Sequence, residues 1–417
     1  MKVLLLGGGG REHVLGWKLA QSPLLTSLVS APGNPGLAAL GETVGVNSLD
    51  PEAVAASAVD GEIDLVVIGP EAPLAVGAVD ALNAAGVAAF GPTAAAARLE
   101  ASKSYAKDVM QRAGVPTAAG ESFTDVDAAI AHLDSINGPY VVKADGLAAG
   151  KGVLVTSDLE AAQAWARACL GGTFGDAGST VVIEEHLDGR EVSVFALVDG
   201  ERALPLAPAR DYKRLRDGDK GPNTGGMGSY SPVDDLPPSL VDRTISDVVE
   251  PVVAVLAADG IRYQGFLYVG LMLTDDGPKV LEFNCRMGDP EAQAVLPRLD
   301  EDLLELLTAG AAGALPDRAL RWSDMAAVDV VLAAPGYPVA PEGGTPITGV
   351  DTADSQPDVL VIHAGTAVSD DQLVTAGGRV LNVVGLGDTV ETARDTAYAA
   401  ADKIKFAGKQ MRTDIGR

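Results

Sequence analysis

The chain has 417 residues, 47% of them hydrophobic, so at about 150 residues per domain it predicts roughly three domains with substantial cores and excludes a disordered or fibrous protein. The 57 acidic residues outnumber the 31 basic ones, and the resulting net charge of -26 repels nucleic acids and anionic membranes alike. We therefore expect no nucleic-acid or membrane partner.

Residues 1–101 alternate short apolar runs with segments of helical periodicity, a pattern typical of an open parallel α/β domain. Strands are predicted at 3–6, 28–30, 63–68 and 87–90, and helices at 14–19 and 76–82. In the second helix, Val76, Val79 and Leu82 recur at every third position between Pro73 and Gly86, which can begin and end a helix.

Residues 102–325 have an α+β pattern, because strands now occur in pairs separated by short turns. The predicted pairs are 140–143 with 153–156, 181–185 with 191–198, and 264–274 with 279–283. Asp199-Gly200 and Asp276-Gly277 are typical hairpin dipeptides. Helices are predicted at 127–137, 159–170, 240–259 and 301–312, with Pro251 kinking or restarting the third.

Residues 326–417 predict a small β-rich C-terminal domain. Its strands are expected at 328–333, 359–363 and 380–384, and its closing helix from Thr389 to about Phe406.

The two cysteines, Cys169 and Cys285, are too few for a disulfide framework, and the four histidines lack the spacing of metal ligands. The apolar run at 1–6 is too short for a signal peptide, and nowhere do 18 apolar residues follow one another. We therefore expect a cytoplasmic protein without zinc or thiol chemistry, in which Cys285 fills core volume.

Four glycines, Gly7–Gly10, follow the first predicted strand and open a helix. They do not complete the dinucleotide fingerprint Gly-x-Gly-x-x-Gly, because its third glycine falls on Glu12 or His13, so a nicotinamide-dependent dehydrogenase is excluded. A glycine turn at a helix N-terminus still binds anions, and we interpret this one as a phosphate site. The alternative is a tight turn without a ligand, and His13 is either a helix residue or a substrate contact.

The segment 146–152 resembles a Walker A loop, but Gly152 replaces its Ser or Thr and a strand follows in place of a helix. A P-loop is therefore excluded, whereas a glycine-rich flap over phosphates, with Lys151 adding positive charge, remains possible. Lys143 lies in the preceding apolar strand and needs an anionic partner, either a nucleotide phosphate or a nearby acid such as Asp145.

The acidic stretch 184–191 joins two predicted strands. Its backbone could bond the edge of an adenine and Glu191 could reach ribose hydroxyls, although acidic hairpin turns without a ligand are also common.

In the strand at 280–286, two-residue periodicity predicts that Glu282, Asn284 and Arg286 share one face, opposite a core face formed by Leu281, Phe283 and Cys285. A carboxylate and an amide oxygen side by side suit Mg²⁺, and the arginine could brace a transferring phosphoryl group. A solvated strand face is the alternative.

Residues 211–229 contain five glycines and seven charged residues without periodicity, which predicts a long functional loop rather than disorder. Its part at 220–228 is suited to wrap an anion.

The most specific segments are GGGGREHVLGWKLAQSP at 7–23, GPEAPLAVG at 69–77, VVKADGLAAGKGV at 141–153, EEHLDGREVSV at 184–194, KGPNTGGMGSYSP at 220–232 and LEFNCRMGDPEAQ at 281–293. Together with HAGT at 363–366, GGRVL at 377–381 and RTDIG at 412–416, they closely resemble the phosphoribosylamine-glycine ligase (glycinamide ribonucleotide synthetase) family of ATP-grasp enzymes.

The resemblance implies a pre-ATP-grasp domain over residues 1–101, an ATP-grasp core over 102–325 with a lid subdomain near 115–190, and a C-terminal domain over 326–417. It also implies the family's reaction, in which ATP and Mg²⁺, or Mn²⁺ as a substitute, join glycine to 5-phospho-β-D-ribosylamine through glycyl phosphate in the second step of de novo purine synthesis. We expect these small molecules as the partners of a monomer.

By position, the resemblance implies that Lys143 and Arg286 are catalytic and that Glu282 and Asn284 bind the metal. ATP contacts are expected from Lys107, Lys143, Gly150, Lys151, Gly152, Glu184, Glu185, Leu187 and Glu191. Substrate contacts are expected from Gly8, Gly9, Gly10, Arg11, Asn34, Glu71, Thr224, Gly225, Gly226, Asp289 and Pro290.

The sequence departs from the family pattern in two places, and the first departure falls on positions assigned to packing. The usual FNVRFGDPE reads FNCRMGDPE, which changes Cys285 and Met287, and the typical Ser before GYP is replaced near Ala334. One alternative is another ATP-grasp carboxylate-amine ligase, which would lack the GGGGREH start and the 211–229 segment. A second is a nucleotide-binding module without turnover, but the complete set of metal and phosphate ligands argues against it.

Overall fold

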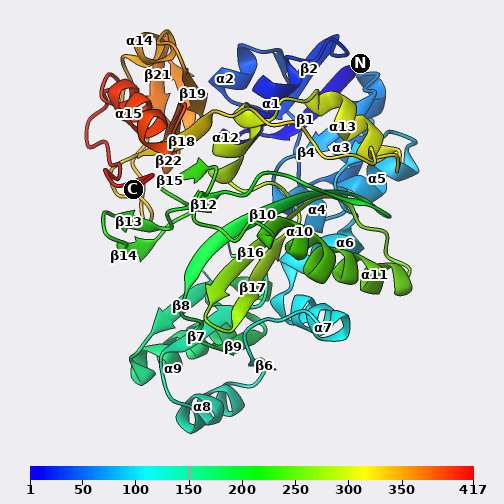
Figure 1. Cartoon of the computed structure of the whole chain (residues 1–417), viewed down its shortest axis with the longest axis vertical. Coiled ribbons are helices and arrows are strands. Elements are labelled where there is room, and N and C mark those ends of the chain that lie inside the picture. Colours follow the sequence, from blue (N-terminus) through cyan, green and yellow to red (C-terminus); the bar gives the residue numbers. More distant parts are fainter. Residues whose placement is uncertain (149–151) are drawn as a thin grey trace.

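The computed structural model describes residues 1–148 and 152–417. Figure 1 shows the N-terminal sheet (blue) beside the C-terminal sheet (orange and red), with a central sheet (green) below them and a small lobe (teal) at the lower end. In the described part of the chain, no helix is both long and apolar enough to cross a membrane.

The N-terminal sheet is parallel throughout, as predicted. Its strand order is β3 (Glu42–Thr43), β2 (Ser27–Pro32), β1 (Lys2–Gly7), β4 (Leu65–Ile68) and β5 (Ala89–Phe90). Alternate residues of β1 enter different cores, because Leu4 packs with α3, α4 and α5 whereas Leu5 packs with α1 and α2. The helices are α1 (Gly10–Leu19), α2 (Pro35–Ala38), α3 (Pro51–Asp60), α4 (Glu71–Ala75), α5 (Ala78–Ala84), α6 (Ala94–Ala101) and α7 (Lys103–Ala113).

The helix predicted at 76–82 is confirmed as α5, but it begins two residues later, at Ala78, and a separate short helix, α4, precedes it. Gly77 lies between them with φ of 94°, a left-handed conformation that glycine adopts without strain, and Val76 is exposed rather than on the buried face.

The central sheet is antiparallel, with the order β11 (Ala203–Pro205), β10 (Arg190–Asp199), β16 (Gln264–Thr274) and β17 (Gly277–Asn284). The predicted pairing of 264–274 with 279–283 is confirmed. One face packs against α10 (Leu240–Thr244) and α11 (Glu250–Ala258), and the other against α12 (Glu291–Val295) and α13 (Leu303–Ala311). Pro251 occupies the first turn of α11, so the helix restarts there as predicted.

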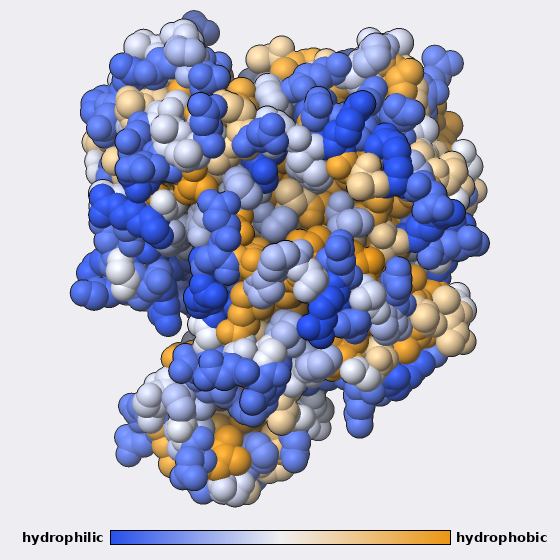
Figure 2. All heavy atoms as spheres, viewed as in Figure 1, coloured by the Kyte–Doolittle hydropathy of each residue, from blue (hydrophilic) through white to orange (hydrophobic). Residues whose placement is uncertain are grey.

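The lobe contains an antiparallel sheet in the order β6 (Gly120–Phe123), β9 (Val181–Glu185), β7 (Tyr140–Ala144) and β8 (Val153–Thr156), with α8 (Val126–Ser135) and α9 (Leu159–Ala168). The predicted β7–β8 pair is confirmed, but the pairing of 181–185 with 191–198 is wrong. β9 lies between β6 and β7, whereas β10 belongs to the central sheet, so residues 186–189 connect two sheets rather than closing a hairpin. Figure 2 shows the lobe projecting below the rest of the molecule, whose surface on this side is hydrophilic towards the rim and carries hydrophobic residues across the centre.

The C-terminal sheet has the order β12 (Arg210–Asp211), β15 (Gly228–Ser231), β18 (Ala326–Ala333), β22 (Arg379–Gly387) and β19 (Val359–His363). It therefore includes two strands from before residue 326. With it lie α14 (Val350–Asp354), the hairpin β20 (Thr366–Ser369) and β21 (Gln372–Thr375), and α15 (Val390–Ala401), which ends before the predicted Phe406.

The segment 211–229 is more regular than its sequence predicts. It contains the hairpin of β13 (Arg214–Arg216) and β14 (Lys220–Asn223), so the expectation of an irregular loop is wrong over these strands. The hairpin forms although its strands have no alternating apolar residues, because Gly218 and Asp219 in the turn, with φ of 66° and 53°, reverse the chain.

Candidate functional site

Two lysines share one buried carboxylate at the junction of the lobe and α7. Lys143 on β7 lies 2.6 Å from Glu184 Oε2, and Lys107 on α7 lies 2.8 Å from Glu184 Oε1. The anionic partner of Lys143 within the protein is therefore Glu184 rather than Asp145, which instead accepts hydrogen bonds from the Ser104 backbone and the Ser102 hydroxyl. This arrangement concentrates two ammonium groups where an anion could bind.

The other residues expected around ATP extend from this pair along β9 and β10. Glu185 lies on the opposite face of β9 from Glu184 and contacts Lys279 at 3.3 Å, while Leu187 is buried. Glu191 pairs with Lys213. The expected contacts Gly150 and Lys151 lie outside the described residues, whereas Gly152 is buried and its carbonyl accepts the Ala144 N–H.

Glu282 and Asn284 lie on one face of β17, as predicted, opposite Gly270 and Tyr268 of β16. The opposite face differs from the prediction, because a β-bulge at Leu281 leaves that residue half-buried and places Val280 in the core with Phe283. Burial tends to raise the pKa of Glu282, but Lys213, Lys143 and Lys103 outweigh it and lower the pKa. Glu282 is therefore held as a carboxylate by the charges of these three lysines.

Arg286 joins β17 to the N-terminal sheet. It donates to Asn284 Oδ1 at 3.0 Å, and it lies 3.3 Å from Glu71, at the carboxyl end of β4, and 2.9 Å from Glu100 on α6. Burial would lower the pKa of Arg286, but the carboxylates of Glu100 and Glu71 outweigh it and raise the pKa. The guanidinium is thus a fixed positive charge beside the expected metal ligands.

The glycine turn after β1 packs tightly against the protein. The Gly9 N–H donates to Glu12 Oε2 at 2.7 Å, and Arg11 Nε donates to Glu12 Oε1 at 2.6 Å. Asn34 donates to the Gly8 carbonyl at 3.0 Å. Any Cβ at Gly8 would lie 2.3 Å from the Gly33 carbonyl oxygen, so close backbone contact alone requires glycine there.

His13 has a structural role on α1. Its Nδ1 accepts the His363 N–H at 2.7 Å, and burial, with a smaller contribution from His363, lowers the pKa of His13 to about 3. The ring is therefore neutral at physiological pH and joins α1 to the end of β19.

The remaining expected substrate residues meet at Arg379 of β22. Arg379 Nη1 donates to the Gly225 carbonyl at 2.6 Å and to the Asp289 carbonyl at 2.7 Å, and Nη2 lies 3.3 Å from Asp289 Oδ2. The Gly226 N–H donates to Thr224, and a Cβ at Gly226 would lie 2.3 Å from Pro290 Cδ. One arginine thus joins the 224–226 turn to Asp289 and Pro290.

Sequence reasoning missed several charged residues of this region. Lys103 donates to the carbonyls of Asp145 and Gly146, and Lys213 lies between Glu191, Glu282 and Asp211. Burial and neighbouring carboxylates, opposed by Lys213, raise the pKa of Asp211 to about 7. The unusual composition of 211–229 could have identified Asp211 and Lys213 as site residues, and the GGRVL segment could have identified Arg379. No sequence pattern around Lys103 indicated a role in the site.

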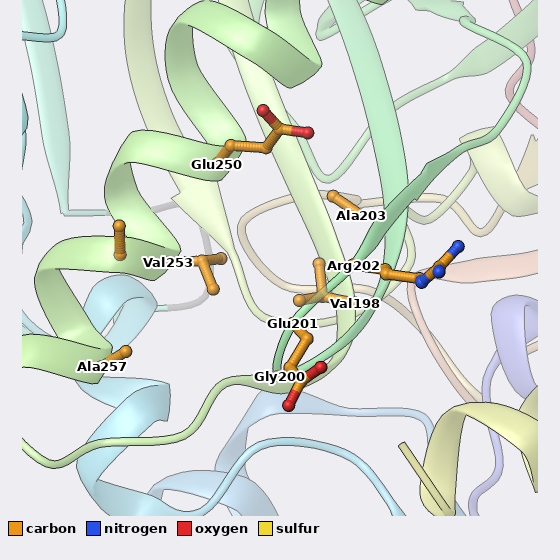
Figure 3. A pocket seen from close by; sticks show the side chains of 9 residues that line it. Val198, Gly200, Glu201, Arg202, Ala203, Glu250, Val253 and Ala257 are labelled. Atoms are coloured by element: carbon orange, nitrogen blue, oxygen red, sulfur yellow. The ribbon is translucent and has the colours of Figure 1, made fainter. Parts of the chain in front are cut away.

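A cavity of about 290 Å³ lies elsewhere in the molecule, and Figure 3 shows the side chains that line it. It lies between the β10–β11 turn and α11, lined by Arg202 and Glu250 among others, and it contains none of the expected site residues. Among residues 1–148 and 152–417, no three His, Cys, Asp or Glu side chains form a group that could hold a metal ion. A metal at β17 would therefore need ligands besides protein carboxylates.

Family models cover most of the chain. Residues 1–100 match the N domain of phosphoribosylglycinamide synthetase, residues 101–292 its ATP-grasp (A) domain, and residues 327–417 its C domain. The protein is therefore of the ATP-grasp class. The biotin carboxylase domain of Hydrogenobacter thermophilus 2-oxoglutarate carboxylase, a complex with MgADP, shares this fold with a TM-score of 0.75 at 18% identity, covering 98% of this chain and 91% of that one.

Two proteins are similar in sequence as well. Phosphoribosylamine-glycine ligase of Mesorhizobium japonicum is 50% identical over 416 residues, which are 100% of this chain and 98% of the relative. The crystal structure of phosphoribosylamine-glycine ligase from Thermotoga maritima has a TM-score of 0.87 at 37% identity and covers 99% of this chain and 100% of that one. The chain belongs to the phosphoribosylglycinamide synthetase family.

Proposed function

We propose that the protein is an ATP-dependent ligase that joins glycine to 5-phospho-β-D-ribosylamine, giving glycinamide ribonucleotide, ADP and phosphate, the second step of de novo purine synthesis. The observation that carries the proposal is the 50% identity over the whole chain to a relative named phosphoribosylamine-glycine ligase. A carboxylate resists attack by an amine because oxide is a poor leaving group. Phosphorylation by ATP gives glycyl phosphate, whose carbonyl the ribosylamine nitrogen attacks while phosphate leaves.

ATP would lie between the lobe and the central sheet. Lys107 and Lys143 would bind its phosphates, with Gly150, Lys151 and Gly152 as further contacts. The adenine would meet Glu184, Glu185 and Leu187, and the ribose would meet Glu191. The paired ammonium groups, 2.8 Å and 2.6 Å from Glu184, support this assignment because a phosphate supplies the same negative charge.

The donors on β17 fit Mg²⁺. Glu282 is a carboxylate without an ion pair or hydrogen bond among the described residues, and the Asn284 amide oxygen adjoins it on one face. Mg²⁺ prefers oxygen ligands and takes one or two from protein when phosphates supply others. When bound, it would neutralise charge on the phosphates, and Mn²⁺ could substitute for it.

The substrates would bind where the glycine turn, β4 and the 224–226 turn converge. Gly8–Arg11, Asn34, Glu71, Asp289, Pro290 and Thr224–Gly226 would supply contacts. Arg286 would stabilise charge on the transferring phosphoryl group, and its contacts with Glu71, Glu100 and Asn284, which fix its orientation, support this role. Packing of the lobe against this region would exclude water from the acyl phosphate.

The domain limits that we propose are 1–101, 102–325 with a lid near 115–190, and 326–417. We also propose that the enzyme acts as a monomer in the cytoplasm.

Release of ADP tests the function. Purified protein with ATP, Mg²⁺, glycine and freshly made phosphoribosylamine should release ADP at a rate that requires both glycine and the amine, with glycinamide ribonucleotide as product. Equal release without either substrate would contradict the proposal. Turnover with another amino acid and not with glycine would favour a different ATP-grasp ligase.

A further inference from the structure

Three buried polar side chains lie together outside the site described above. Asp329 on β18, Asn382 on β22 and Gln293 on α12 are each 0% or 1% exposed. Both carboxylate oxygens of Asp329, both amide atoms of Asn382 and Oε1 of Gln293 are without a hydrogen-bond partner among the residues that the structure describes. Unpaired polar groups at this depth are rare, because burial removes their bonds to water.

The strand register brings Asp329 and Asn382 together, and α12, which carries Gln293, packs on the same face. Asp329 pairs with Val384 across β18 and β22, so Asn382, two residues from Val384, lies diagonally beside Asp329 on the same face. This face meets α12, because the Ser229 hydroxyl, opposite Asp329 on β15, donates to the Pro290 carbonyl just before that helix. Figure 1 shows α12 between the C-terminal strands and α1.

Gly10 closes the group from the side of α1. A Cβ there would lie 2.4 Å from Asn382 Nδ2 and 2.6 Å from Gln293 Nε2, so the two amides are neighbours. The group therefore joins the N-terminal glycine turn, α12 and the C-terminal sheet.

The chemistry of the group favours a cation. It offers four unpaired oxygens, two from Asp329, one from Asn382 and one from Gln293, against a single unpaired amide nitrogen. Arg379, whose charge acts on Asp329, is already bonded to the carbonyls of Gly225 and Asp289. Burial and the neighbouring carboxylates of Asp289 and Glu291, opposed by Arg379, raise the pKa of Asp329, which shows how poorly the protein alone compensates this charge.

We propose that Asp329, Asn382 and Gln293 bind a monovalent metal cation such as Na⁺ or K⁺. Carboxylate and amide oxygens are ligands for hard cations. The group holds one carboxylate, so a monovalent ion neutralises it, whereas a divalent ion would leave a buried positive charge.

The cation would act on the substrate region through Gln293. Gln293 Nε2 donates to Asp289 Oδ1 at 2.9 Å, so an ion held by Oε1 fixes the orientation of the amide and with it the Asp289 carboxylate. This consequence rests on the proposed function, whereas the binding itself does not.

Thermal unfolding in different salts tests the binding directly. At one ionic strength, Na⁺ or K⁺ should raise the Tm of the wild-type protein by roughly 2 °C relative to choline, in a saturable way. Asp329→Asn, which keeps the shape but removes the charge, should abolish the response. The control Asp371→Asn, in the exposed β20–β21 turn, should retain it.

Equal Tm values in choline, Na⁺ and K⁺ would overturn the proposal, as would a response that Asp329→Asn retains. A Tm that depends on pH but not on the cation would mean that Asp329 is simply protonated, and would overturn it as well. Should Asp329→Asn fail to fold, thallium NMR of the wild-type protein decides: a bound Tl⁺ signal that K⁺ displaces supports the site, and its absence refutes it. Activity enters none of these measurements, so failure of the ligase assay leaves the test intact.

Discussion

Replacing Glu184 by Gln tests the charge balance at the expected phosphate site. The substitution keeps the shape of the side chain but removes the only negative charge that the two lysines contact directly in the described part of the chain. Lys107 retains its bond to the Ala118 carbonyl, at 2.7 Å. Lys143 has at best the neutral side-chain amide that the substitution introduces as its partner. Two ammonium groups would then remain buried without a carboxylate.

The side chains involved are 7% exposed at Glu184, 11% at Lys143 and 14% at Lys107, so solvent screens the pair little. Removing one partner of a buried ion pair costs about 3–5 kcal/mol, and the amide that remains recovers part of it. We expect the free energy of unfolding to fall by about 3 kcal/mol, which corresponds to a decrease of roughly 3 °C in Tm, because the entropy of unfolding a chain of 417 residues is about 0.9 kcal/mol/K.

Scanning calorimetry without nucleotide measures this decrease. Glu121→Gln, on the neighbouring strand β6 with an exposed side chain, is the matched control and should leave the Tm unchanged. Inorganic tripolyphosphate should stabilise Glu184→Gln more than the wild-type protein, because its phosphates replace the lost charge without competing with a carboxylate. An unchanged Tm, or equal stabilisation of both proteins, would refute the reasoning.

Three further predictions concern the metal ligand, the buried histidine and the arginine of β22. Glu282→Gln should lower kcat by at least about a hundredfold and raise the Mg²⁺ concentration needed for half-maximal activity; an unchanged Mg²⁺ titration would remove Glu282 from the metal site. His13 has a folded pKa of about 3 against 6.5 when unfolded, so the unfolded chain binds more protons between these values and the Tm should fall as pH decreases from 6.5 towards 3. His13→Asn, which can still accept the His363 N–H, should have a shallower pH dependence of Tm, and an unaltered slope would contradict the assignment. Arg379→Met should raise KM for phosphoribosylamine about 10- to 100-fold and leave KM for ATP unchanged, since the bonds it loses reach Gly225 and Asp289; an equal rise in both constants would argue against a local effect.

The parts of the fold that local sequence patterns determine were predicted correctly. The parallel N-terminal sheet follows from alternating apolar runs, and the hairpin of β16 and β17 from a two-residue turn next to alternating residues. The bulge at Leu281 shows the limit of this reasoning. One extra residue shifts the two-residue alternation, and nothing in the strand sequence marks where the shift occurs.

The arrangement of strands into sheets depends on contacts between distant segments, and it was predicted less well. Asp188-Gly189 has the composition of a hairpin turn, yet the chain there passes from the lobe to the central sheet because β9 is already paired on both edges by β6 and β7. The carboxylate that pairs with Lys143 was not predicted, for the same reason. Asp145 is nearest in sequence, but the pairing of β7 with β9 places Glu184 beside Lys143.

Four cationic residues of the candidate site share one property, which is that each of them already contacts a carboxylate of the protein. Lys107 and Lys143 contact Glu184, Lys213 contacts Glu191, and Arg286 contacts Glu71 and Glu100. When an anionic substrate binds, it replaces a protein carboxylate as the partner of a cation. Its binding energy is therefore the difference between the energies of two ion pairs rather than the full energy of one. The protein carboxylates keep the cations desolvated and oriented, which lowers the reorganisation needed when a phosphoryl group carries the developing charge. By this argument, variants that remove a protein carboxylate should strengthen the binding of simple polyphosphates while reducing stability, and the two effects should vary together across Glu184, Glu191 and Glu71.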